Sequence, residues 1–192
     1  MKSIKIVVAA IVIMTFSQIA MGAQGPTAFL KSLDHKMQPL VAKAGHNHAK
    51  IIKLINKMLD FDALCRASLG KHWDTHTAAQ QQEFAATLKA LIEQNVIKRL
   101  KSTNSNNLSY DSEKINGNKA LVVTTVKDGD GPRASAIEIV YHLTKKGGSW
   151  IVVDMETDGM SLVSNYRSQF NKMIKKDGWD AMIKKMKDKL NK

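Results

Sequence analysis

The first half of the chain repeats its apolar residues every three or four positions, which is the period of an α-helix. The pattern predicts a helix over residues 26–38, a second over residues 51–59, a short third one and a long fourth one. The apolar residues of the first helix are Phe29, Leu33 and Met37, and those of the second are Ile51, Ile52, Leu54, Ile55, Met58 and Leu59. The short third helix contains Leu64, and the long fourth helix has a stripe formed by Phe84, Leu88, Leu91, Ile92, Val96 and Leu100. The second stripe is broad enough to be buried on more than one side.

Local signals mark where these helices begin and end. Pro39 disturbs the first pattern, because proline lacks the amide hydrogen that a helix interior needs. Asp62 is placed to cap the third helix, and Gly70 is a common residue at a helix C-terminus. Thr77 and Gln80 have the capping-box spacing and are expected to open the longest helix.

Beyond the polar segment 102–107, which breaks the long helix, the apolar period changes to two, as in a β-strand. Turn residues stand at 128–131 and at 145–148. The expected strands cover residues 121–126, 137–143 and 150–155, with a weaker one about Leu108 and Tyr110. We expect these strands to form one antiparallel sheet.

The strands on either side of the 145–148 turn are expected to pair as a hairpin. Side chains alternate across a strand, so every second residue of each strand shares a face. The residues expected on one face are Ile137, Ile139 and Tyr141 with Ile151, Val153 and Met155. This arrangement predicts a continuous apolar sheet surface, from which His142 points away.

The end of the chain returns to the helical period. Two more helices are expected, with apolar stripes formed by Leu162, Tyr166, Phe170 and Met173 and by Met182, Ile183, Met186 and Leu190. The predicted fold is therefore α+β, with helices packed on one curved antiparallel sheet of about four strands. Periodicity leaves open whether sheet and helices enclose an ordinary core or an apolar cavity for a ligand.

The N-terminal 22 residues have the pattern of a cleavable secretory signal. Two lysines give a positive start, residues 6–16 form an uncharged apolar run, and small residues precede Ala23. Such a run is shorter than the about 20 residues that a membrane-spanning helix needs. We therefore expect residues 1–22 to be removed on export and residues 23–192 to form one soluble domain.

The chain is strongly basic, with a formal net charge of +12, which becomes +10 without the leader lysines. Its lysines are spread along the chain and concentrate near the end, without the aromatic platform of RNA-binding modules. We expect anionic lipid headgroups or acidic protein surfaces as targets, and no nucleic acid. Cys65 is the only cysteine, so an internal disulfide is impossible and a buried structural thiol is expected.

Candidate catalytic and metal-binding patterns are weak. His72 and His76 have the spacing of two zinc ligands on a helix, but the adjacent glutamate of the zinc motif is missing. Ser161, His142 and Asp154 lack the strand–nucleophile–helix motif of a hydrolase, and serine at 161 suits a helix N-cap. We expect no enzyme activity, no metal and no cofactor.

Three segments carry a more specific pattern. They are Phe61-Asp-Ala-Leu-Cys-Arg-Ala-Ser-Leu-Gly70, followed by Trp73 and Gln80-Gln-Gln-Glu-Phe84; Trp150-Ile-Val-Val-Asp154; and Asp158-Gly-Met-Ser-Leu-Val-Ser-Asn-Tyr-Arg-Ser-Gln-Phe170. Together they resemble the MlaC family of periplasmic phospholipid-binding proteins, also called toluene-tolerance proteins. The resemblance covers nearly the whole expected domain. Cys65 and Ser68 depart from the family pattern, which usually has a larger apolar and a β-branched residue there.

The resemblance implies a cone-shaped, NTF2-like fold with an apolar cavity between sheet and helices. It implies a monomeric periplasmic carrier that holds a glycerophospholipid by its acyl tails. Its expected partners are an inner-membrane lipid ABC transporter complex and an outer-membrane lipoprotein complex. Two alternatives stay open: an adaptor that docks on the transporter without lipid, and a carrier of another lipid such as a hopanoid. Asp154, Asn165 and Arg167 are expected to be structural.

The candidate lipid-binding residues combine the expected sheet face with the helical residues that oppose it. A sheet face must be covered whether or not it binds lipid, so roughly half of these residues are expected to be core. The candidates are Leu64, Leu69, Phe84, Leu88, Leu91, Val122, Val126, Ile137, Ile139, Tyr141, Ile151, Val153, Met155, Leu162, Tyr166 and Phe170.

Overall fold

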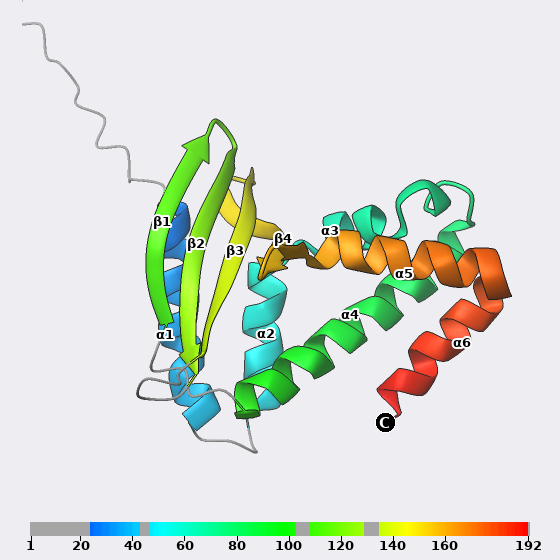
Figure 1. Cartoon of the computed structure of the whole chain (residues 1–192), viewed down its shortest axis with the longest axis horizontal. Helices are drawn as coiled ribbons and strands as arrows, with labels where there is room; N and C mark the ends of the chain where they lie inside the picture. Colours follow the sequence, from blue (N-terminus) through cyan, green and yellow to red (C-terminus); the bar gives the residue numbers. More distant parts are fainter. Residues whose placement is uncertain (1–23, 43–46, 103–107, 129–134, 192) are drawn as a thin grey trace, which may run out of the picture.

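The structure is a computed structural model that describes residues 24–42, 47–102, 108–128 and 135–191. The expected signal segment 1–22, the polar break after residue 102 and most of the 128–131 turn lie outside these residues. Figure 1 shows a sheet with two helices behind it and an arm of helices that extends to one side. Within the described ranges, no helix has both the length and the apolar composition needed to cross a bilayer.

The helices follow the predicted order. They are α1 (Pro26–Ala42), α2 (His48–Met58), α3 (Phe61–Leu69), the short 3-10 helix η1 (Gly70–His72), α4 (Ala78–Ser102), α5 (Leu162–Asp177) and α6 (Trp179–Leu190). Proline starts α1, where its missing amide hydrogen costs nothing. Pro39 does not end this helix, which continues to Ala42.

The strands are β1 (Leu108–Asn116), β2 (Lys119–Asp128), β3 (Ser135–Lys146), β4 (Ser149–Thr157) and β5 (Met160–Ser161). They form one antiparallel sheet in the order β1-β2-β3-β4-β5. The prediction of an α+β fold on a single antiparallel sheet is confirmed, with a two-residue fifth strand beyond the four expected.

Helix boundaries confirm one predicted cap and correct another. The Gln80 amide donates to Thr77 Oγ1 (3.3 Å) and the Thr77 amide donates to Gln80 Oε1 (3.0 Å), as a capping box requires. The prediction for α3 was wrong, because Asp60 rather than Asp62 accepts the Ala63 amide, at 3.2 Å. The helix starts two residues earlier than predicted, and Asp62 lies exposed in its first turn.

The pairing of β3 with β4 corrects the predicted sheet face. Tyr141 lies opposite Met155, as expected, but a bulge follows and Leu143 lies opposite Val152. Val153 is the extra residue of the bulge, and Ile151 pairs with Thr144. Ile151 and Val153 therefore do not share the Tyr141 face, because one inserted residue reverses the alternation along β4. Val152 and Trp150 take their place, and both are buried.

The helical arm packs around its own aromatic centre. Phe84 of α4 is fully buried and meets Phe170 of α5 edge to face, with ring centroids 5.1 Å apart. Trp179 of α6 lies 6.1 Å from the Phe84 ring and stacks on His76 at 3.8 Å. These contacts hold α4, α5 and α6 together and make the arm a compact unit beside the sheet (Figure 1).

Two residues of the sequence signature join α3 to α5. Arg167 of α5 donates from Nε to the Ala67 carbonyl at 2.8 Å. Gly70 ends α3 with φ +57°, and a Cβ at this position would stand 3.2 Å from Arg167 Cδ. Glycine is required here for its backbone conformation and for this close approach.

Candidate functional site

Burial of the inner sheet face decreases from one end of the strands to the other. At the β3–β4 hairpin end, Leu143 lies opposite Val152 and both are buried. Farther along β3, Tyr141, Ile139 and Ile137 are each only half-buried. The hairpin end of this face is closed core, as are Val122 and Thr124 of β2, and the apolar residues toward the other end are only half-buried.

The facing helix α1 shows the same gradient. Leu30 and Leu33 near its start are buried, whereas Met37, Leu40 and Val41 near its end are half-buried. This helix packs against β1 and β2. Figure 1 shows the end of α1 at the same end of the molecule as the end of β2 and the start of β3. The half-buried apolar residues of helix and sheet therefore gather at one end of the core.

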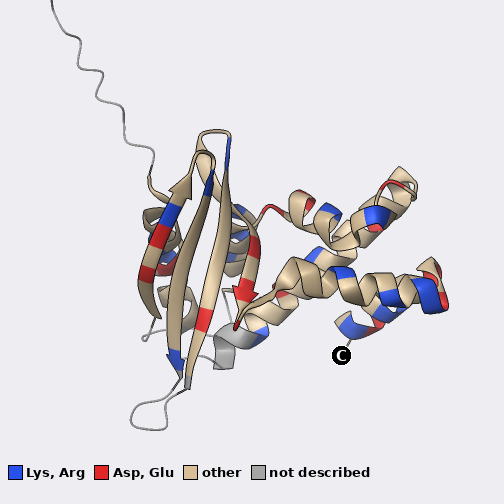
Figure 2. Cartoon of the chain, turned by 45° about the horizontal axis from the view of Figure 1, so that its top comes forward, with Lys and Arg blue, Asp and Glu red and all other residues tan. Residues whose placement is uncertain are grey.

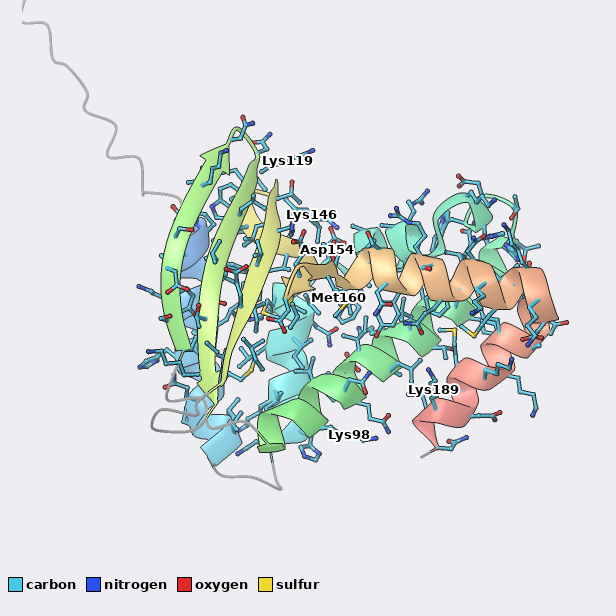
Figure 3. All side chains as sticks on the ribbon, in the orientation of Figure 1. Lys98, Lys119, Lys146, Asp154, Met160 and Lys189 are labelled. Atoms are coloured by element: carbon cyan, nitrogen blue, oxygen red, sulfur yellow. The ribbon has the colours of Figure 1, made fainter. Side chains whose placement is uncertain are left out.

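Helix α4 reaches the same end of the molecule. Its first turns contribute buried Phe84 and Leu88, and its later residues Val96 and Ile97 are half-buried. Lys98, labelled in Figure 3, marks where this part of α4 lies below the sheet. We call the half-buried apolar set of these elements the open end of the core: Met37, Leu40, Val41, Val96, Ile97, Val126, Ile137, Ile139, Tyr141 and Met155.

The structure divides the predicted site residues into four groups. The sheet group lies together on one face, since Val122 pairs with Tyr141, Val126 with Ile137, and Tyr141 with Met155, and Ile139 lies between Ile137 and Tyr141 on β3. Val122 is fully buried in the core, and the other members are half-buried. Leu162 and Tyr166 are half-buried on α5. Ile151 and Val153 do not join the sheet group, for the reason given above. The fully packed group lies in the hydrophobic core: Leu64, Leu69, Phe84, Leu88, Leu91 and Phe170.

Sequence reasoning missed the contribution of α1. Met37 was expected in a helical stripe, but nothing in its spacing shows that α1 covers the inner sheet face. Tyr110 of β1 was also overlooked, although strand alternation places it in line with Thr124 and Ile139 on that face. Finding these residues requires the strand register, which the sequence does not contain.

A small polar cluster interrupts the apolar surface between α1 and the sheet. Asp34 lies on the inner stripe of α1 beside Leu30, Leu33 and Met37, and Gln38 Nε2 donates to its Oδ2 at 3.0 Å. Burial raises the pKa of the Asp34 carboxyl, although the hydrogen bond from Gln38 and the charge of the neighbouring His35 oppose this shift. Asp34 is thus a half-buried carboxylate in a largely apolar setting.

The negative charge of this carboxylate also affects the pKa values of two tyrosines on the sheet. Burial, followed by the negative charge of Asp34, raises the pKa of Tyr141 to about 12. The same two causes, in the same order, raise the pKa of Tyr110. Both hydroxyls therefore stay protonated at neutral pH and are available as hydrogen-bond donors. Lys31 lies at the edge of this cluster, with Nζ 5.1 Å from the centroid of the Tyr110 ring.

Comparison with known proteins shows which family this chain belongs to. The model of the MlaC protein family matches residues 27–188. The chain belongs to the MlaC family. A curated relative, the intermembrane phospholipid transport system binding protein MlaC of Haemophilus influenzae, is 26% identical over 120 residues, covering 62% of this chain. The match spans 56% of that relative, a little over half of its length.

A solved structure shares the fold of this MlaC-family chain. It is the phospholipid-binding protein of Ralstonia solanacearum in complex with a phospholipid. The TM-score is 0.73 at 21% sequence identity, and the match covers 88% of this chain and 99% of that one. At this identity the structural likeness establishes the fold. The family predicted from the three sequence segments is confirmed by the match to the family model.

The strand-to-helix junction of this MlaC-family chain is a structural cap. Asp154, labelled in Figure 3 where β4 leads into α5, accepts from Ser161 Oγ at 2.6 Å and from the Val163 amide at 3.1 Å. Ser161 Oγ in turn accepts the Ser164 amide at 3.0 Å. His142 lies on the other sheet face, as predicted, and pairs with Glu156 at 2.7 Å. These three groups thus do not assemble as a catalytic triad.

The two histidines with zinc-like spacing have structural partners. His72 Nε2 lies 3.0 Å from Asn171 Oδ1, and His76 stacks on Trp179. In the part of the chain that the structure describes, no group of three or more histidine, cysteine, aspartate or glutamate side chains is arranged to hold a metal ion. The chemistry that the described site supports is apolar contact with a polar cluster at one side.

Proposed function

We propose that this chain is a soluble periplasmic carrier that binds a glycerophospholipid by its acyl tails. The observation that carries this proposal is the open end of the core, where an apolar sheet face and α1 leave half-buried surface. Folded domains usually bury such a face completely, and uncovered apolar surface of this kind is typical of a ligand site. The family membership and the phospholipid in the Ralstonia solanacearum complex support the same ligand class.

The physics of lipid transfer fits a carrier without catalysis. Burying one methylene group is worth about 0.8 kcal/mol, so two 16-carbon tails represent roughly 25 kcal/mol. A free lipid therefore crosses water too rarely to be useful. Exchange between a bilayer and an apolar protein site replaces one apolar environment by another and is close to neutral. The carrier needs no nucleotide of its own, and its partners set the direction of transport.

We propose that it exchanges lipid between an inner-membrane ABC transporter complex and an outer-membrane lipoprotein complex, after removal of residues 1–22. The basic surface suits contact with acidic partner surfaces or anionic headgroups. Figure 2 shows lysine and arginine gathered toward the α5–α6 end of the arm. In α6, however, Lys184 pairs with Asp188 of the same helix, while Lys185 pairs with Asp177 of α5 and Lys187 with Glu83 of α4. The last two ion pairs join α6 to the neighbouring helices of the arm.

Native mass spectrometry of protein purified without detergent tests the proposal. We expect a bound mass equal to a phospholipid, and uptake of lipid from vesicles by protein stripped of its ligand. Replacing Ile139 by glutamate places a charge on the half-buried face and should abolish the bound mass. The matched control is Ile115→Glu, the same change at a residue that is 51% exposed in β1.

Two results would count against the carrier. A clean mass without ligand under gentle conditions, with no uptake from vesicles, would favour an adaptor that only docks on the transporter. Equal lipid loss in the Ile139→Glu and Ile115→Glu variants, with both still folded by circular dichroism, would show that the inner sheet face is not the binding site. Extraction of the bound lipid would separate a glycerophospholipid from a hopanoid.

A further inference from the structure

The layer formed by α1 and α2 carries lysine side chains on its outer side. Both helices lie behind the sheet and contact each other, and their buried residues belong to the core (Figure 1). In α2, Lys50, Lys53 and Lys57 are exposed. At 3.6 residues per turn, these three positions fall within about 60° of the helix circumference, on the side opposite buried Ile55.

This outer side has no exposed carboxylate from either helix. Helix α2 contains no acidic residue, and the one acidic residue of α1, Asp34, is half-buried on the inner stripe of that helix. Lys36 of α1 is exposed as well. We call Lys36, Lys50, Lys53 and Lys57 the helix-layer lysines. Within the ranges that the structure describes, no carboxylate lies within ion-pair distance of these four. The layer therefore exposes charge of a single sign.

The lysines of the arm have a different setting. In α6, three lysines pair with carboxylates, as described above. In α5, exposed Lys175 and Lys176 stand directly before exposed Asp177. Acidic and basic groups are therefore interleaved at that end of the molecule. Since opposite charges partly cancel, the helix layer attracts an extended anionic surface more strongly than the arm does.

The composition of the helix layer favours a lipid surface over a protein partner. Protein–protein interfaces are enriched in aromatic residues and arginine and depleted in lysine. Over the described parts of α1 and α2, the exposed residues are alanine, histidine, proline and lysine, with no aromatic residue and no arginine. Lysine is a point charge on a flexible stem, so it suits a fluid array of phosphate groups that offers no fixed geometry.

We propose that the helix-layer lysines dock the protein on the headgroups of an anionic bilayer. This inference rests on the proposed function, because docking brings the open end of the core to the source of its lipid. Lys36 directly precedes Met37 of that end, and Leu40 and Val41 follow in the next turn of α1. Attraction between lysine and an anionic surface falls off within a Debye length, about 8 Å at physiological ionic strength. The contact is therefore reversible, as a carrier that leaves the membrane requires.

Sedimentation with vesicles measures the docking. The exported protein, purified from the periplasm, is mixed with vesicles of phosphatidylglycerol and phosphatidylcholine in equal amounts, or of phosphatidylcholine alone. We expect binding to the anionic vesicles only, with release at about 1 M salt, where the Debye length is about 3 Å. Each lysine near an anionic surface is worth about fivefold in binding. Replacing Lys50, Lys53 and Lys57 together by glutamine, which keeps the helix propensity, should weaken binding by on the order of 100-fold.

The matched control replaces Lys172, Lys175 and Lys176 of α5 by glutamine. These residues are exposed, and the change removes the same charge from the arm, so binding should weaken by less than about fivefold. Equal weakening by the two triple variants, both folded by circular dichroism, would show that net charge alone attracts the membrane and would overturn the assigned surface. Wild-type protein that carries lipid but does not bind anionic vesicles would also overturn it, in favour of an acidic protein as the target. Protein that takes up no lipid would instead refute the proposed function.

A fluorescent label tests the orientation while every lysine stays in place. Ala49→Cys and Ser168→Cys introduce a thiol at exposed positions of α2 and α5, and the natural Cys65 is buried, so labelling is selective. An environment-sensitive fluorophore at residue 49 should shift its emission to shorter wavelength on anionic vesicles, and the same fluorophore at residue 168 should not. A shift at residue 168 alone would contradict docking through the helix layer.

Discussion

Replacing Phe84 by alanine separates residues that stabilise the fold from residues that contact a ligand. Phe84 is fully buried and its ring meets Phe170 and Trp179 in the helical arm. Removing a buried phenylalanine costs about 3–5 kcal/mol, and the edge-to-face pair with Phe170 adds about 0.5–1.5 kcal/mol beyond the buried area. We therefore expect a loss of about 4–5 kcal/mol in the free energy of unfolding.

The contrasting change is Ile139→Ala on the half-buried sheet face. Because this side chain is only partly covered, we expect its loss to cost about 1 kcal/mol in stability. Lipid occupancy should respond in the opposite order, with a lower bound fraction in Ile139→Ala and an unchanged fraction in the folded portion of Phe84→Ala.

Urea unfolding followed by circular dichroism measures the first quantity, and native mass spectrometry of the folded protein measures the second. Phe84→Leu serves as a control, since it keeps most of the volume and should cost less than the alanine change. The reasoning is refuted if Phe84→Ala unfolds within about 1 kcal/mol of the wild type. It is also refuted if the folded fraction of this variant has lost its lipid.

Three further outcomes follow from single contacts. Asp60→Ala removes the N-cap of α3 and the partner of Lys146, so the urea midpoint should fall by the equivalent of about 1 kcal/mol or more, whereas Asp62→Ala should leave it nearly unchanged. Cys65 should resist a thiol reagent at pH 8 until urea unfolds the chain, because burial raises its pKa to about 12; rapid labelling of the native protein would contradict this. Burial raises the folded-state pKa of Asp34, so its charged form weakens folding as pH rises from about 4. The stability of Asp34→Asn relative to wild type, from urea unfolding at pH 4 and pH 7, should therefore increase toward pH 7.

The sequence predicted the elements well because their burial is periodic. A helix in the arm exposes one side and buries the other, so stripes such as Phe84 and Leu88 are visible in the spacing alone. The strands were also found, but their register depended on a feature with no local signal. Val153 is inserted as a bulge, and nothing in the run Trp150–Met155 distinguishes it from its neighbours. The candidate site inherited this error at Ile151 and Val153.

The polar part of the site was missed for a different physical reason. Asp34 sits in a helix whose apolar stripe is regular, and an isolated acidic residue in a helix is usually solvated. Only the tertiary arrangement shows that α1 packs against β1 and β2, with Lys31 Nζ 5.1 Å from the centroid of the Tyr110 ring. In the same way, Asp60 was passed over as a cap because its second role, the ion pair with Lys146, joins it to a hairpin 86 residues away.

The two ends of the molecule thus have different tasks. The arm is closed by aromatic contacts among α4, α5 and α6, and these contacts are complete without any ligand. On the sheet side, Leu143, Trp150 and Val152 are buried near the β3–β4 hairpin and Val122 and Thr124 are buried in β2, whereas Val126 and Ile137 farther along are half-buried. In the proposed carrier, the acyl tails would cover these half-buried residues and those at the end of α1. A ligand that binds the folded state adds its binding free energy to stability, and here that gain falls on the sheet side. We therefore expect the proposed carrier to keep its fold through the arm while the lipid enters and leaves.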